Sequence, residues 1–190
     1  MAVPAPVLTG DRVVLRPVEE RDRDVRRSFG YHREIERGYG YVRDSGPMSE
    51  TEAQEWYDGF LARRDEPCWV IEVEGRLAGV VFLHAHEVAD RRARLAIGFA
   101  APEFQGRGYG TESVMLVLGH AFGAMDLHRV DLRVLEFNTG AIACYRRCGF
   151  VEEGRQREDC LLEGEWYDDI MMGILDREYH DLVTRRSRRG

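Results

Sequence analysis

Lysine is absent from this chain of 190 residues, and its 27 basic residues are all arginine. The absence excludes Schiff-base chemistry and covalent attachment of pyridoxal phosphate, because both require a lysine amine. It also excludes a Walker-type phosphate loop, in which a lysine contacts the nucleotide phosphates. Enzyme classes that depend on a lysine side chain are therefore ruled out.

Long apolar segments are also missing. No run approaches the roughly 18 consecutive apolar residues that indicate a membrane-spanning helix. The first residues, MAVPAPVLTGDRVV, contain no basic region followed by an apolar stretch, so they do not resemble a secretory signal. We therefore expect a cytoplasmic enzyme that makes no contact with a membrane.

Cysteine is scarce, and the residues present are Cys68, Cys144, Cys148 and Cys160. None of them forms the CxxC pair typical of zinc sites, and no matched set of histidine and cysteine partners accompanies them. We expect no bound metal. Reduced, buried thiols are the better interpretation, as is usual for an intracellular protein.

The charge distribution is uneven along the chain. The formal net charge is −7, although four arginines crowd the final segment, 185–190. Without these arginines the remainder of the chain has a net charge of about −11. An acidic surface repels nucleic acids and attracts cationic molecules. The balance therefore predicts no nucleic-acid partner and favours a cationic substrate, while 185–190 is expected to form a flexible tail.

Strand and helix patterns occur in a mixed order along the chain. A strand is expected at 13–18 and is followed by a helix start, while 30–47 has the glycine and tyrosine content of a loop. Ser49 and Glu52 have the spacing of a capping box and predict a helix as far as Leu61. Further strands are expected at 68–74, 77–87, 93–100, 129–135, 150–160 and 166–175, with helices up to about 124 and over 138–147. Several successive strands followed by a strand–helix–strand unit predict one α+β (mixed α/β) domain.

A glycine-rich segment follows the strand expected at 93–100 and opens the next helix; it reads Gln105-Gly106-Arg107-Gly108-Tyr109-Gly110-Thr111-Glu112. Glycines let backbone amides approach a ligand closely, because no Cβ intervenes. The helix adds its unpaired first amides and the positive end of its dipole. Such a site suits a pyrophosphate, and Arg107 can add a charge-assisted bond. A plain strand-to-helix turn is the alternative, since the third glycine of a dinucleotide fingerprint is missing.

A second segment of interest is the short helix expected at 138–147. Asn138 is a candidate N-cap and Gly149 a candidate C′ residue, so the helix has less than three turns. Asn138 and Tyr145 lie near one face of it. Tyr145 is either a core tyrosine or part of a site. Asn138 is either a cap alone or a cap that also contacts a ligand.

Together these two segments resemble the GNAT superfamily of N-acetyltransferases. The stretch from Gln105 to Gly110 is similar to that superfamily's Gln/Arg-x-x-Gly-x-Gly/Ala loop, and Asn138, Tyr145 and Cys148-Gly149-Phe150 are similar to its following motif. The start, 8–17, and the end, 164–175, look like the branch that holds ribosomal-protein-alanine and spermidine acetyltransferases. Only 30–47 has no recognisable counterpart, and it falls where family members build the acceptor side.

The resemblance implies one domain, 1–184, with a central, mostly antiparallel, splayed mixed sheet flanked by helices, and a possible homodimer. It also implies transfer of an acetyl group from acetyl-CoA to a primary amine of a small molecule or a peptide N-terminus. The end of the strand at 93–100 would bond the pantetheine arm, and the glycine loop would hold the pyrophosphate. Tyr145 would be the catalytic residue that protonates the departing thiolate. The cofactor-binding residues implied are Phe99, Ala101, Gln105, Gly106, Arg107, Gly108, Tyr109, Gly110, Thr111 and Asn138.

The sequence leaves the general base open. Many members of the superfamily carry a glutamate on the strand before the glycine loop, whereas 93–100 contains no acidic residue. We assign no base, because each acidic or histidine candidate also suits a structural or surface role: His84, His86, Glu87, Glu103 and Glu136. The missing glutamate keeps open a non-catalytic acyl-CoA-binding sensor, against which the presence of Tyr145 argues.

The acceptor amine is also left open. An acidic protein whose aromatic residues include Tyr31, Tyr39, Tyr41 and Trp56 suits a polyamine or an amino sugar. The N-terminus of a ribosomal protein is the alternative that the resemblance carries with it.

Overall fold

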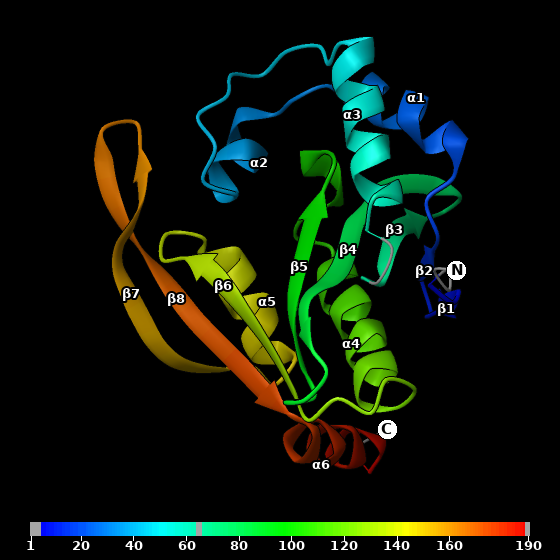
Figure 1. The fold of residues 1–190 in the computed structure, drawn as a ribbon, viewed down its shortest axis with the longest axis vertical. Coiled ribbons are helices and arrows are strands. Elements are labelled where there is room, and N and C mark those ends of the chain that lie inside the picture. The colour runs from blue at the N-terminus through cyan, green and yellow to red at the C-terminus, as the bar shows by residue number, and fades with distance from the viewer. Residues whose placement is uncertain (1–4, 64–65, 189–190) are drawn as a thin grey trace.

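The computed structural model describes residues 5–63 and 66–188. The described part of the chain contains one sheet of eight strands in the order β1-β2-β3-β4-β5-β6-β8-β7 (Figure 1). The strands are β1 Leu8–Thr9, β2 Val13–Arg16, β3 Cys68–Val73, β4 Arg76–Glu87, β5 Arg92–Phe99, β6 Arg129–Leu135, β7 Val151–Leu162 and β8 Glu165–Leu175. The helices are α1 Glu20–Phe29, α2 Arg33–Gly38, α3 Glu50–Leu61, the 3-10 turn η1 Pro102–Phe104, α4 Tyr109–Phe122, α5 Thr139–Arg147 and α6 Asp176–Ser187.

The sheet opens between its two central strands. The parallel strands β5 and β6 pair only at 92–94 with 129–131, whereas β4 and β5 pair along nearly the whole of β5. The ends of β5 and β6 at Phe99 and Leu135 therefore separate, and Figure 1 shows the opening between them. Every other pair of neighbouring strands is antiparallel. The splayed, mostly antiparallel mixed sheet that the resemblance implies is confirmed.

Alternating residues of β3 show how helices cover both faces of the sheet. Trp69 and Ile71 are fully buried in the main core, which includes α4 and α5. Val70, which points the other way as strand geometry requires, packs with Val25 and Trp56 of α1 and α3. Helix α4 contributes Val114, Leu118 and Ala121 to the same core, and all three are fully buried.

Both helix starts predicted from capping residues are confirmed. The Ser49 hydroxyl accepts from the amide of Glu52 at 3.2 Å, and the Glu52 carboxylate accepts from the amide of Ser49 at 2.8 Å. The Asn138 side chain accepts from the amide of Ala141 at 3.2 Å and so begins α5. These bonds join residues close in sequence, which is why the pattern alone reveals them.

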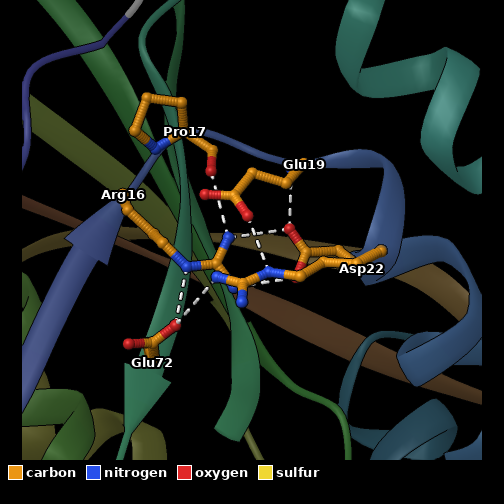
Figure 2. A network of polar contacts seen from close by, with 6 residues as sticks. Arg16, Pro17, Glu19, Asp22 and Glu72 are labelled. Atoms are coloured by element: carbon orange, nitrogen blue, oxygen red, sulfur yellow. Dashed lines mark hydrogen bonds and ion pairs between the residues drawn. The ribbon is translucent and has the colours of Figure 1, made fainter. Parts of the chain in front are cut away.

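A buried ion network fixes α1 to the sheet (Figure 2). The guanidinium of Arg16, at the end of β2, donates to both carboxylate oxygens of Asp22 at 2.8 Å and to Glu72 of β3 at 2.7 Å. These carboxylates raise the pKa of Arg16, with Asp22 the larger contributor. Asp22 also accepts from the amide of Glu19 at 2.7 Å, so one carboxylate both begins α1 and neutralises the arginine.

The structure corrects several expected boundaries. The segment 30–47, predicted to be a loop, contains the helix α2. The β3–β4 turn lies at Glu74 and Gly75 rather than one residue later, because both have positive φ, as a type I′ hairpin requires. A further helix, α6, follows β8 and includes residues 185–187 of the expected tail, whose last two residues lie outside the described part.

Within the described residues, no helix has the length and apolar character to cross a membrane.

Candidate active site

The glycine loop adopts backbone conformations that explain its composition. Gly106 and Gly108 have φ values of 72° and 86°, in the left-handed region that favours glycine. Gly108 is the N-cap of α4, and the first turn of that helix is Tyr109, Gly110 and Thr111. The first amides of a helix have no intrahelical acceptor, so the loop presents backbone N–H groups to an anion.

The loop is held against the start of β2 by Arg12. Its guanidinium donates to the carbonyl of Arg107 at 3.0 Å and lies over the ring of Tyr109. Glu112 accepts from the amides of Arg12 and Val13 at 2.7 and 3.0 Å. The side chain of Arg107 itself is exposed. The backbone of the loop is therefore fixed by Arg12 and Glu112, whereas the side chain of Arg107 points to solvent.

The end of β5, the start of α4 and the middle of α5 converge beside the glycine loop. A Cβ placed on Gly110 would lie 3.4 Å from the ring of Phe99 and 3.5 Å from the sulfur of Cys144. The Thr111 hydroxyl is 3.3 Å from the same sulfur. The structure thus brings together segments that the sequence places about 45 residues apart, as the predicted cofactor site requires.

The remaining predicted cofactor residues lie around this point. Gln105 ends η1 with its side chain exposed, and its amide donates to the carbonyl of Pro102 at 2.9 Å. Ala101 is buried in the main core and can face a ligand only through its backbone. Asn138 uses both ends of its amide, because its nitrogen donates to the Gly38 carbonyl of α2 at 3.3 Å while its oxygen caps α5.

Tyr145 lies on α5 with only 8% of its surface exposed, against Phe150. Burial raises the pKa of its phenol, so the hydroxyl stays protonated across neutral and mildly alkaline pH. No described residue accepts or donates a hydrogen bond at this hydroxyl. A buried phenol that keeps its proton and lacks a partner is a suitable proton donor to a ligand.

Tyr39, which follows α2, makes a contact that was not predicted from the sequence. Its hydroxyl accepts from the amide of Phe99 at 2.8 Å, at the splayed end of β5. Desolvation of this hydroxyl raises the pKa of Tyr39 to about 12, although the residue as a whole is 41% exposed. The backbone donor predicted to contact the cofactor is therefore already bonded to a side-chain oxygen from the segment 30–47.

A pocket of about 430 Å³ extends from the end of β5 toward α2 and α3. All four aromatic residues that the sequence suggested for the acceptor side contribute to its wall: Tyr31, Tyr39, Tyr41 and Trp56. Three glutamates and two arginines complete its charged groups: Glu36, Glu52, Glu55, Arg26 and Arg43. Its size falls in the range of small-molecule sites, and its aromatic and acidic groups suit a cation.

The possible bases considered from the sequence have other positions or partners. His84 pairs with Arg94 while Gly79 pairs with Phe99, so the histidine lies roughly 16 Å along β4 from the splayed strand end. Glu103 forms an ion pair with Arg76 at 2.8 Å. Glu136 accepts from the amide of Asp168 at 3.0 Å. None of these three groups lines the pocket.

Comparison with known proteins identifies sequences and a solved structure that are similar to this chain. Residues 12–151 match the family model described as acetyltransferase (GNAT) domain. Spermidine N(1)-acetyltransferase of Escherichia coli (strain K12) is 29% identical over 170 residues, 88% of each chain. The enzyme of that name from Vibrio cholerae is 33% identical over 132 residues, 69% of this chain and 76% of that protein. A crystal structure of spermidine N-acetyltransferase from Vibrio cholerae in complex with CoA and spermine has a TM-score of 0.76 and 28% identity, over 90% of this chain and 99% of that one.

Proposed function

We propose that this chain, which belongs to the GNAT family of acetyltransferases and transfers an acetyl group from acetyl-CoA to an amine, uses a small linear polyamine as its acceptor. The observation that carries the proposal is the pocket beside Phe99, whose wall combines aromatic rings with three glutamates. Relatives with similar sequences are named spermidine acetyltransferases, which supports the same acceptor class.

For the acetyl donor, we assign the pyrophosphate to the backbone amides of Gly106 to Thr111, with Arg107 as an added charge. The pantetheine arm would then enter between the ends of β5 and β6 and pass Gly110, where the missing Cβ leaves room beside Phe99. The bond between the Phe99 amide and the Tyr39 hydroxyl supports this path, because it shows an oxygen acceptor in reach of that amide.

In the reaction, the neutral amine attacks the thioester carbonyl, so that a C–N bond forms and the C–S bond then breaks. The Phe99 amide, once released by Tyr39, is our choice to stabilise the negative oxygen of the tetrahedral intermediate. The departing thiolate receives the phenolic proton of Tyr145, whose hydroxyl has no other partner among the described residues. The amine nitrogen loses one proton when the amide forms, and one proton returns to the Tyr145 phenolate, so that the phenol is restored.

The proposal is tested by incubating the purified protein with acetyl-CoA and a panel of amines while thiol release is recorded. The panel contains spermidine, an amino sugar and a peptide with a free N-terminus. We expect spermidine to have the highest kcat/KM, because its ammonium groups suit a wall in which aromatic rings accompany three glutamates and only two arginines. Release that is fastest with the peptide would overturn the polyamine assignment.

A further inference from the structure

One glutamate of the pocket differs from every other charged group in its wall. Glu36, on α2, is only 8% exposed and lines the pocket. No hydrogen bond or ion pair joins its carboxylate to any other described residue. Buried carboxylates are normally paired, because burial of an isolated charge is unfavourable. The carboxylate oxygens of Glu36 are not fully enclosed by the described residues, so they open onto the pocket, where a ligand can supply the missing partner.

The backbone around Glu36 is held firmly. Its carbonyl accepts from the amides of Tyr39 and Tyr41 at 3.0 Å each, and the preceding Ile35 is buried. Gly38 accepts from Asn138 of α5. Glu36 and Tyr39 are three residues apart at the end of α2, so they share a face. The glutamate is thus fixed about one helical turn from the tyrosine whose hydroxyl reaches Phe99.

The arginines of the pocket are engaged elsewhere. Arg26 donates to the carbonyl of Gly30 at 2.7 Å, and burial lowers its pKa, although the charge of Glu36 partly opposes this shift. Arg43 is exposed and stacks on the ring of Tyr31, with its guanidinium carbon 4.0 Å from the ring centre. Neither guanidinium lies within ion-pair distance of Glu36. The negative charge of the carboxylate is therefore available to a cation that enters the pocket.

We propose that Glu36 determines acceptor specificity by holding a nitrogen of the acceptor that does not react. The inference rests on the proposed function, since it concerns the acceptor of the same site. The reacting nitrogen has to be neutral before it attacks, and a carboxylate bonded to it would favour its charged form. A second ammonium group, which stays charged throughout, suits this carboxylate. The acceptor class is therefore a diamine or polyamine rather than a monoamine.

The test compares diamines with monoamines in the Glu36→Gln variant. Each α,ω-diaminoalkane with three to eight carbons is assayed against the monoamine of equal length, and the ratio of the two kcat/KM values is the readout. We expect the wild-type protein to prefer the best diamine and Glu36→Gln to reduce that preference by roughly tenfold to a hundredfold, chiefly through KM. Glu34→Gln is the matched control, because Glu34 is an exposed residue of the same helix and does not line the pocket.

Two further measurements exclude a structural role for Glu36. Loss of an unpaired buried charge predicts that the Tm of Glu36→Gln is equal to or above that of the wild type, whereas loss of a structural contact would lower it. Calorimetry of the preferred diamine with the CoA-bound protein should show weaker binding to Glu36→Gln and a smaller loss for Glu36→Asp, which keeps the charge.

The assays distinguish a failure of the Glu36 proposal from a failure of the proposed function. If the wild-type protein releases thiol with amines but treats diamines and monoamines alike, Glu36 has no such role while the acetyltransferase assignment stands. An unchanged preference in a folded Glu36→Gln variant leads to the same conclusion. If the wild-type protein releases no thiol with any amine, the proposed function itself fails.

Discussion

Tyr145, which we propose as the proton donor, combines burial with an unpartnered hydroxyl. The phenol is enclosed by the core, which raises its pKa, and yet its hydroxyl has no protein partner in the described chain. A phenol in water already holds its proton at neutral pH. Burial therefore widens the pH range over which the phenol stays protonated and does not change its protonation state at neutral pH. The structural requirement is the position of the hydroxyl beside the departing sulfur.

We predict that Tyr145→Phe lowers kcat by about 10²–10⁴-fold, the usual contribution of general acid catalysis. The affinity for acetyl-CoA should stay within about twofold, because we assign the phosphate contacts to the loop amides and not to the phenol. Thiol release measures the first quantity and calorimetry the second. Normal turnover by a folded variant would remove Tyr145 from the mechanism.

The hydroxyl of Tyr39 competes with the cofactor for one backbone donor. In the structure it accepts from the Phe99 amide, the same amide that we assign to the thioester. We predict that Tyr39→Phe tightens acetyl-CoA binding by about two- to tenfold, the equivalent of one net hydrogen bond. Titration calorimetry decides the matter: weaker binding would mean that Tyr39 assists the cofactor instead of giving way to it.

At the scale of elements, the site exists because β5 and β6 share only their first three paired positions. Their separation leaves the Phe99 amide without a partner on β6, so that it donates to Tyr39, and α4 and α5 approach this end of β5 from the main core. Gly110, in the first turn of α4, has no Cβ and so leaves room beside Phe99 for the proposed path of the pantetheine arm. Gly108 is less informative as a mutation site, since its φ of 86° would strain any other residue.

We predict that Gly110→Ala weakens acetyl-CoA binding by roughly tenfold without loss of stability. The new methyl group would have ordinary contacts with Phe99 and Cys144 in the free protein but would occupy the proposed path of the pantetheine arm. Gly140→Ala is the control, because a Cβ there meets nothing within 4 Å. Equal affinities of the two variants, measured by calorimetry, would argue that the arm follows another path.

At the scale of the molecule, the Arg16–Asp22–Glu72 network joins the first helix to the sheet. Asp22 is almost fully buried, with 1% of its surface exposed. We predict that Asp22→Asn lowers the free energy of unfolding by about 3–5 kcal/mol, because it leaves a buried guanidinium short of one countercharge. Urea denaturation provides the measurement.

Asp24→Asn serves as the comparison for this prediction. Asp24 pairs with Arg23 on the exposed face of α1, where an ion pair contributes at most about 1 kcal/mol. Similar losses for both aspartates would show that burial of the network does not govern its contribution.

The homodimer that the family resemblance implies stays a prediction, which light scattering tests. Leu161 and Trp166 are exposed on the β7–β8 hairpin. Figure 1 shows where this hairpin lies in the fold.

Features that depend on neighbours in the chain were determined by the sequence. The Ser49–Glu52 box and the Asn138 cap involve residues three positions apart, so local pattern predicts them. The motif resemblance also predicted the family and the splayed sheet. Helix α6 was missed because half of its residues are charged and none of them is buried.

The acceptor side was decided only by tertiary structure. Helix α2 has six residues, too few to be stable alone, and it forms where Ile35 is buried and Gly38 meets Asn138. The contact of Tyr39 with Phe99 joins residues 60 positions apart. No local pattern encodes such a pair, because its energy comes from packing and from a backbone amide left free by the splay. The same packing leaves Glu36 buried and unpaired, which the sequence presents only as one glutamate among many.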